Sequence, residues 1–253
     1  MENDQSLLSS AKKFLIEALG NHRDQKRNFA ILHAVTATEL VLKERLSKIH
    51  PTLIFKNIDA VSFQGVQTIS LANLPQRLIN LDVRMDPKEA KLISTFAKWR
   101  NQIVHNMPLF DQEAADKQLP QLLDFLAVFL RRELNTPLED FLPKSLYKTA
   151  SNLLKEWKRV VEAAKSEAQA EGSVLSDSCP DCGATEVLCL RDEKRVSCHL
   201  CATKHYRYDH CTQCGRKTVS RFSSFDEGNY CDSCINDGGD HYIQTLIDIE
   251  RGK

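Results

Sequence analysis

The sequence predicts a mainly α-helical protein that ends in a small, cysteine-rich β region. Three observations lead to this fold class. Apolar residues recur at helical spacing over the first half of the 253-residue chain, where glycine is scarce. A second amphipathic stripe follows Pro143, and all nine cysteines lie between Cys179 and Cys234. We therefore expect a helical bundle, then a linker helix, then two small β-hairpin modules.

The helical bundle is predicted over residues 1–140. Apolar periodicity, prolines and polar caps place its helices at 7–19, 24–49, 74–81, 86–107 and 119–134, with a loop at 55–69. The clearest helix start combines Asp86 as the N-cap, Pro87 in the first turn and Glu89 completing a capping box. Pro108 should end that helix.

An amphipathic linker helix is predicted over residues 141–174. Its charged residues lie opposite an apolar stripe that consists of Leu146, Ala150, Leu153, Leu154, Trp157, Val160, Val161 and Ala164. We expect this helix to pack on the bundle first and then to continue as a spacer that ends at Gly172. Residues 237–253 are assigned to a C-terminal tail with room for one short helix.

Charge and hydropathy argue against three classes of protein: polybasic binders of nucleic acid, membrane-spanning proteins and secreted proteins. The formal net charge is zero, so the chain as a whole is no polybasic binder of nucleic acid. No apolar run is long enough to span a membrane, and residues 1–10 lack the basic and apolar regions of a signal peptide. We therefore expect a cytoplasmic protein, whose closely spaced cysteines bind metal rather than form disulfides.

Eight of the nine cysteines form four Cys-x-x-Cys hooks, a spacing that lets one tight turn supply two ligands to a tetrahedral zinc ion. In chain order the hooks are Cys179 with Cys182, Cys198 with Cys201, Cys211 with Cys214, and Cys231 with Cys234. The segment between the first and second hooks, or the third and fourth, is long enough for a β-hairpin. The pattern resembles a tandem pair of zinc ribbons over residues 175–236. It predicts two structural Zn²⁺ ions with no open coordination position.

Two points about the cysteines stay open. Sequential pairing of the hooks is favoured because each pair encloses a hairpin, the first built from 187–190 and 195–197 and the second using 219–225. Interleaved pairing, first hook with third and second with fourth, is the alternative. The ninth cysteine, Cys189, is predicted to be a small core residue. Three histidines could substitute as zinc ligands although none is required: His199, His205 and His210.

The predicted ribbons also carry basic and aromatic side chains that suit contact with phosphates and stacking on bases. The candidate RNA-contact residues are Tyr206, Arg207, Tyr208, Arg216, Lys217 and Arg221. The aromatic residues could instead fill the small core of a zinc ribbon, and such a fold can bind protein as well as nucleic acid. RNA contact and protein contact therefore both stay open.

Two charged residues of the bundle lie where burial is costly. On a wheel of 3.6 residues per turn, Arg100 lies in the middle of the apolar face of the 86–107 helix. Glu39 lies on the apolar face of the 24–49 helix in the same way. We predict that Glu39 and Arg100 pair, because each charge needs a partner. The pair could do no more than fix the register of the two helices.

The residues after Arg100 add a second pattern. Asn101 follows it directly, and His105 stands five positions further on. In a helical bundle of this size, covering residues 5–135, this resembles the R-x4-6-H motif of the HEPN superfamily. The resemblance implies a metal-independent endoribonuclease of toxin–antitoxin, antiviral-defence or RNA-processing type that works as a homodimer. It implies Arg100 and His105 as the catalytic pair with Asn101 as polar support, and Glu39 is a candidate for a further supporting role.

The chemistry suits these residue types. Histidine can transfer a proton near neutral pH, and a fixed arginine can stabilise charge on a phosphorane-like transition state. On an ideal helix, however, Arg100 and His105 diverge by ~140°. Either the helix loosens before Pro108, or a second protomer contributes its own pair across a two-fold axis.

The same residues leave other function classes to consider. The leading alternative is a non-catalytic adaptor that binds nucleic acid or protein through both halves. A DNA-binding regulator is disfavoured because the C-terminal region is near neutral and has no obvious recognition helix. A zinc-dependent enzyme is disfavoured because no open metal position is evident. The expected partners are RNA, a second copy of the chain and a regulatory protein, with no membrane.

Overall fold

The computed structural model describes most of the first two thirds of the chain and parts of the remainder. The described residues are 6–60, 62, 65–105, 112–172, 174–175, 179, 184–191, 195–200, 204–208 and 218–220, with backbone only for 112–116, 206–208 and 218–220. The chain divides into two compact units, Met1–Arg159 and Val160–Lys253.

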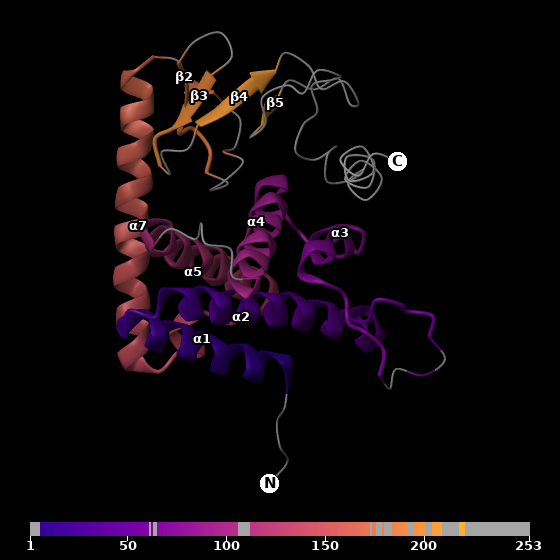
Figure 1. Cartoon of the computed structure of the whole chain (residues 1–253). Helices are drawn as coiled ribbons and strands as arrows, with labels where there is room; N and C mark the ends of the chain where they lie inside the picture. The colour runs from indigo at the N-terminus through magenta and orange to yellow at the C-terminus, as the bar shows by residue number, and fades with distance from the viewer. Residues whose placement is uncertain are drawn as a thin grey trace. The chain divides into compact units, whose positions relative to one another are not determined.

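The first unit is built from helices, as predicted (Figure 1). In chain order they are α1 (Leu7–Arg23), α2 (Arg27–Ile49), α3 (Leu74–Ile79), α4 (Pro87–Val104), α5 (Gln112–Leu134), α6 (Leu138–Phe141) and the first part of α7 (Lys144–Ala170), with short 3₁₀ turns at Pro51–Ile54 and Leu71–Asn73. The predicted loop after α2 is largely irregular and contains one isolated β-bridge between Phe55 and Thr68.

Helix α4 begins as its sequence predicts. Asp86 caps it by accepting a hydrogen bond from the Lys88 amide at 2.8 Å, and Glu89 accepts one from the Asp86 amide at 2.9 Å. The helix ends at Val104, earlier than the predicted end near Met107. His105 is the C-cap, with φ of −89° and ψ of 14°, so it has already left regular helical geometry.

Two other predicted boundaries are wrong because α1 continues through a glycine and α5 contains a proline in its interior. Helix α1 continues through Gly20 to Arg23, and the turn after it uses Gln25 at a φ of 62°. Helix α5 begins at Gln112 and contains Pro120 in its interior. A single interior glycine costs a helix only about 1 kcal/mol relative to alanine, an amount that tertiary packing readily overrides.

The core of the first unit forms around α2. This helix packs against α1, α4 and α5. Its buried residues therefore lie on several of its faces and not on a single stripe. Figure 1 shows α1 and α2 side by side. The largest fully buried side chains are Leu15, Leu19, Ile31, Leu42, Leu46, Leu71, Leu74, Leu78, Ile93, Phe96, Leu119 and Phe129.

Helix α7 starts in the first unit and finishes in the second. In the first unit Ala150 is fully buried, and Leu146, Leu153 and Leu154 pack against the helical core, which agrees with the prediction of a packed helix. In the second unit its last turns also pack, since the buried Ala168 accepts a hydrogen bond from a strand residue. The apolar face of α7 thus continues to the helix end, where it packs within the second unit.

The second unit contains a small antiparallel sheet with its strands in chain order. They are β1 (Val174–Leu175), β2 (Leu188–Leu190), β3 (Arg195–Cys198), β4 (Lys204–Tyr208) and β5 (Thr218–Ser220). The predicted first hairpin is present as β2 and β3, with Cys189 opposite Ser197. The described core of this unit includes Val187, Leu188, Val196 and Leu200.

The prediction of two separate hairpins is corrected by strand β4. It pairs with β3 on one side and with β5 on the other, so one continuous sheet crosses both predicted cysteine units. Residues 204–208 lie between two cysteine hooks, where no strand is predicted from the sequence.

Among the described residues, no helix combines the length and apolar character needed to cross a bilayer.

Replacing the buried Phe129 with alanine should lower the free energy of unfolding by about 3–5 kcal/mol, because it leaves a cavity in the helical core. The neighbouring Val128 is 48% exposed and provides the matched control, so Val128→Ala should change stability little. Chemical denaturation followed by circular dichroism compares the two. Equal losses for both variants would contradict the assigned core face.

Candidate functional site

The predicted pair of charges within the bundle is present. Arg100 of α4 donates from Nη1 to Oε2 of Glu39 on α2 at 2.6 Å. The Glu39 side chain is 16% exposed and that of Arg100 is 30% exposed, so the pair lies at the edge of the apolar interface. The pairing predicted from two helical wheels is confirmed.

A second cation joins the pair, and the sequence prediction missed it. Lys43 donates from Nζ to Oε1 of Glu39 at 2.6 Å and to the Thr68 hydroxyl at 2.9 Å, and its side chain is only 7% exposed. Lys43 stands four residues after Glu39 on the same helix, a spacing at which opposite charges meet. We call Glu39, Lys43 and Arg100 the shared-carboxylate cluster. It holds two cations and one carboxylate.

The other two predicted site residues lie on the surface at the end of α4. Asn101 and His105 are both exposed, and the His105 amide donates to the Asn101 carbonyl at 2.9 Å. No hydrogen bond or ion pair joins the His105 side chain to Arg100 among the residues that the structure describes. Because α4 ends at Val104, the ~140° divergence of an ideal helix does not fix the direction of His105.

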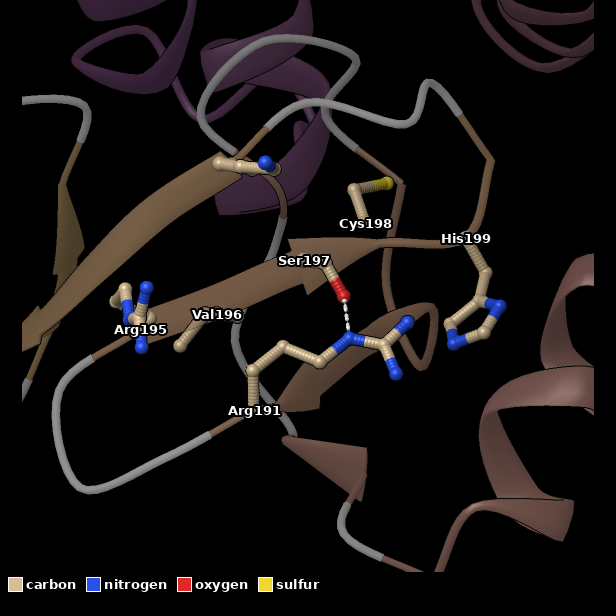
Figure 2. A pocket seen from close by; sticks show the side chains of 7 residues that line it. Arg191, Arg195, Val196, Ser197, Cys198 and His199 are labelled. Atoms are coloured by element: carbon tan, nitrogen blue, oxygen red, sulfur yellow. Dashed lines mark hydrogen bonds between the residues drawn. The ribbon is translucent and has the colours of Figure 1, made fainter.

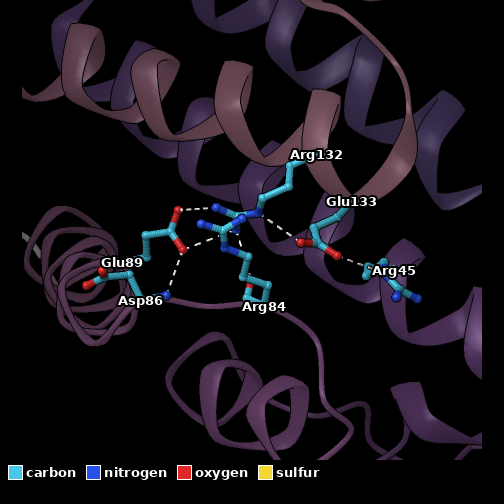
Figure 3. Close-up of polar contacts among 6 residues, drawn as sticks. All are labelled: Arg45, Arg84, Asp86, Glu89, Arg132 and Glu133. Carbon is cyan, nitrogen blue, oxygen red and sulfur yellow. Dashed lines mark hydrogen bonds and ion pairs between the residues drawn. The ribbon is translucent and has the colours of Figure 1, made fainter.

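The opposite end of α4 carries a different ionic network (Figure 3). Arg132 donates to both carboxylate oxygens of Glu89 at 2.9 and 3.1 Å and to Glu133 at 2.8 Å, while Arg45 pairs with Glu133 at 3.3 Å. The hydrogen bond to Glu89 is the main cause of a raised pKa for Arg132. Two cations face two carboxylates here, so this network is balanced and fixes helix positions.

Two of the eight predicted zinc ligands are described. Cys179 and Cys198 are both buried, and no disulfide joins the described cysteines. The Cys179 amide donates to the Ala184 carbonyl at 2.8 Å, and Nε2 of His205 lies 3.2 Å from the Cys179 sulfur. His205 therefore contacts the first hook. The remaining predicted ligands lie outside the described residues: Cys182, Cys201, Cys211, Cys214, Cys231 and Cys234.

A hollow of about 530 Å³ over β3 gathers basic side chains in the second unit (Figure 2). We call it the basic hollow. Its lining residues are Arg191, Arg195, Val196, Ser197, Cys198, His199 and Lys204. Figure 2 shows Arg191 reaching toward Ser197, to which it donates a hydrogen bond. Sequence reasoning missed this set because the residues come from three segments that only strand pairing brings together.

The predicted RNA-contact residues are only partly described. Tyr206, Arg207 and Tyr208 belong to β4, where Tyr206 is the ladder partner of Arg195, and only their backbone is described. Arg216, Lys217 and Arg221 lie outside the described residues.

The end of α7 and the strands it covers form a third group of polar residues. Glu171, Cys189 and His199 place one carboxylate oxygen, one sulfur and one ring nitrogen within 4.8 Å of one another. Burial is the main cause of a raised pKa for the Cys189 thiol, and the charge of Glu171 adds to it. Partial desolvation opposes the shift of Glu171, but His199 and Arg191 together lower the pKa of its carboxyl group.

Glu39→Gln should lower the free energy of unfolding by about 2–3 kcal/mol, because Lys43 and Arg100 would lose their shared charged acceptor. Adding Lys43→Met should recover part of this loss, since the buried ammonium is then gone. Chemical denaturation of both variants measures the effect. Glu17→Gln on the exposed face of α1 is the control, and a loss there equal to that of Glu39→Gln would contradict the prediction.

Comparison with known proteins assigns no family to the chain. No protein-family model matches it, and neither a curated protein nor a solved structure gives a significant match.

Proposed function

We propose that the chain is a metal-independent endoribonuclease of toxin, defence or RNA-processing type, with Arg100 and His105 as its catalytic pair. The observation that carries the proposal is the charge balance of the shared-carboxylate cluster. The single Glu39 carboxylate pairs with both Arg100 and Lys43, so the cluster holds two positive charges and one negative charge. The excess positive charge lies at a partly exposed position. An anion such as an RNA phosphate would balance that charge.

The exposed His105 at the end of the same helix supplies the second requirement. A neutral imidazole would take the proton from a ribose 2′-hydroxyl, and the resulting oxygen would attack the adjacent phosphorus. The bond from phosphorus to the 5′-oxygen of the next nucleotide would break, and that oxygen would take up a proton from solvent. The products would be a 2′,3′-cyclic phosphate and a 5′-hydroxyl end. Arg100 would stabilise the charge that develops on the phosphate oxygens, and Asn101 would add a polar contact.

A homodimer is part of the proposal. The Arg100 and His105 side chains come from one helix and its cap, and a second protomer could place its own pair beside the first. A site shared between protomers would accept the phosphate from both sides.

The C-terminal region would bind RNA or a regulatory protein. Two structural Zn²⁺ ions held by the eight hook cysteines would stabilise it, which requires a reducing compartment such as the cytoplasm. The basic hollow supports RNA contact because Arg191, Arg195 and Lys204 are all exposed cations around one concavity.

The alternative is an adaptor that binds RNA or protein without cleaving it. The balanced network around the partly buried Arg132 supports this alternative, because each of its charges already has an opposite partner within the bundle. An adaptor would use Arg100 in the same way, and His105 would then be dispensable.

His105→Ala should reduce cleavage of mixed RNA at least 100-fold while the fold is retained, because the proton acceptor is lost. The assay uses zinc-loaded, folded full-length protein with EDTA present in solution, and the product ends are analysed for cyclic phosphate. His50→Ala, at an exposed histidine after α2, should leave cleavage unchanged.

Equal cleavage by the parent and His105→Ala would remove His105 from the mechanism. No cleavage by the parent, from a protein preparation shown to be a folded dimer, would favour the adaptor instead.

Reversing two charges in the basic hollow, Arg195→Glu with Lys204→Glu, should weaken binding of single-stranded RNA about 10-fold or more at low salt. The dependence of log affinity on log salt should also become shallower by about 1–2, since two phosphate contacts are lost. Fluorescence anisotropy at several salt concentrations measures both. Lys13→Glu with Lys48→Glu makes the same change in net charge on exposed helix residues, and an equal effect from this control would contradict a local contact.

A further inference from the structure

We infer that Glu171, Cys189 and His199 form a further binding site for a divalent metal ion of the zinc class, separate from the four cysteine hooks. None of the three is one of the eight hook cysteines. The site also does not depend on the proposed nuclease activity.

The three ligand atoms converge from different parts of the second unit. Glu171 follows the last turn of α7, Cys189 is the central residue of β2, and His199 follows β3. Their ligand atoms lie within 4.8 Å of one another, and His199 Nε2 is 3.3 Å from Glu171 Oε2. One thiolate, one imidazole and one carboxylate are ligand types that zinc accepts, and binding would draw them closer around the ion.

The histidine is oriented for this role. Its amide donates to the Val187 carbonyl at 2.8 Å, which ties the residue to the sheet. Glu167, one turn before Glu171 on α7, places Oε2 3.5 Å from His199 Nδ1. The Nε2 atom is buried and makes no hydrogen bond of good geometry, although it lies near Glu171. In metal-binding histidines, one ring nitrogen commonly contacts a carboxylate while the other is left to bind the metal. Here Glu167 contacts Nδ1, which leaves Nε2 to bind the ion.

The cysteine is held in place by the helix. Cys189 is fully buried, and its thiol donates to the Ala168 carbonyl at 3.3 Å. A divalent ion binding here would displace the thiol proton to solvent and form a sulfur–metal bond. The positive ion would also offset the negative charge of Glu171 beside that sulfur.

Arg191 is the internal competitor for the site. Its Nη1 lies 2.8 Å from Glu171 Oε2, so without metal it supplies the positive charge beside this carboxylate. If the group is only an ion pair around a buried thiol, removing Arg191 creates no metal affinity. If it is a metal site, removing Arg191 leaves Glu171 free to bind the ion, and affinity rises. The two readings thus predict different results for one substitution.

Three protein ligands leave a fourth coordination position open. An ion bound there would exchange more readily than one enclosed by four cysteines, and water would complete its coordination. Because His199 and Arg191 also line the basic hollow, the ion would add positive charge at the edge of that concavity.

The test counts metal ions on the full-length chain. The protein is saturated with zinc, freed of excess metal by gel filtration and weighed by native mass spectrometry. Cys189→Ala and the partly exposed Glu171→Gln should each carry one ion fewer than the parent. Glu186→Gln, at an exposed glutamate that pairs with Lys165, should keep the parent count. The comparison holds whatever number of ions the hooks bind, and circular dichroism checks that each variant is folded.

The affinity of the additional ion provides the second measurement. Titration with Co²⁺ of protein whose hooks are filled with zinc should produce sulfur-to-cobalt absorption in the parent. Glu167→Gln should weaken this binding about 10-fold or more, because the histidine loses its orienting carboxylate. Arg191→Met should strengthen it. Equal metal counts for the parent, Cys189→Ala and Glu171→Gln, or weaker binding by Arg191→Met, would overturn the inference.

Discussion

The first unit depends on a carboxylate that two helices and two cations share. Glu39 lies where α2 and α4 meet, and an isolated charge at such an apolar edge would be strongly destabilising. Lys43 satisfies it from within α2, and Arg100 satisfies it from α4. The same contacts set the register of the two helices, because Arg100 reaches Glu39 from only one position along α4. Phe96, one turn before Arg100 on α4, is fully buried in the helical core.

Charge balance distinguishes the two ends of α4. At its start, Arg132 and Arg45 face Glu89 and Glu133, and every charge in the network has an opposite partner. Toward its end, two cations share one carboxylate. Both arrangements hold helices together, but only the second leaves an excess charge that an anion could neutralise. A partly buried arginine alone therefore does not identify a site, whereas an excess of cations over carboxylates gives a reason to look for one.

The sequence predicted those features of the fold that depend on residues close together in the chain, such as helix caps and the faces of helices. The capping box at Asp86 and the Glu39–Arg100 pair could be derived because caps and helical faces depend on neighbours along the chain. Strand β4 and the Glu171, Cys189 and His199 group could not, because they exist only through pairing between distant segments. Cys189 shows the difference well. Its burial in β2 was predicted, but its neighbours on α7 and after β3 carry no sequence signal.

The double pairing of β4 makes the C-terminal sheet indivisible. A chain cut between β4 and β5 would present the outer edge of β4 with unpaired amides and carbonyls, and such an edge readily recruits a strand from another molecule. A cut before β4 would expose β3 in the same way. Attempts to express one cysteine unit alone would thus produce an aggregation-prone fragment. A C-terminal fragment intended to fold on its own must therefore include β5.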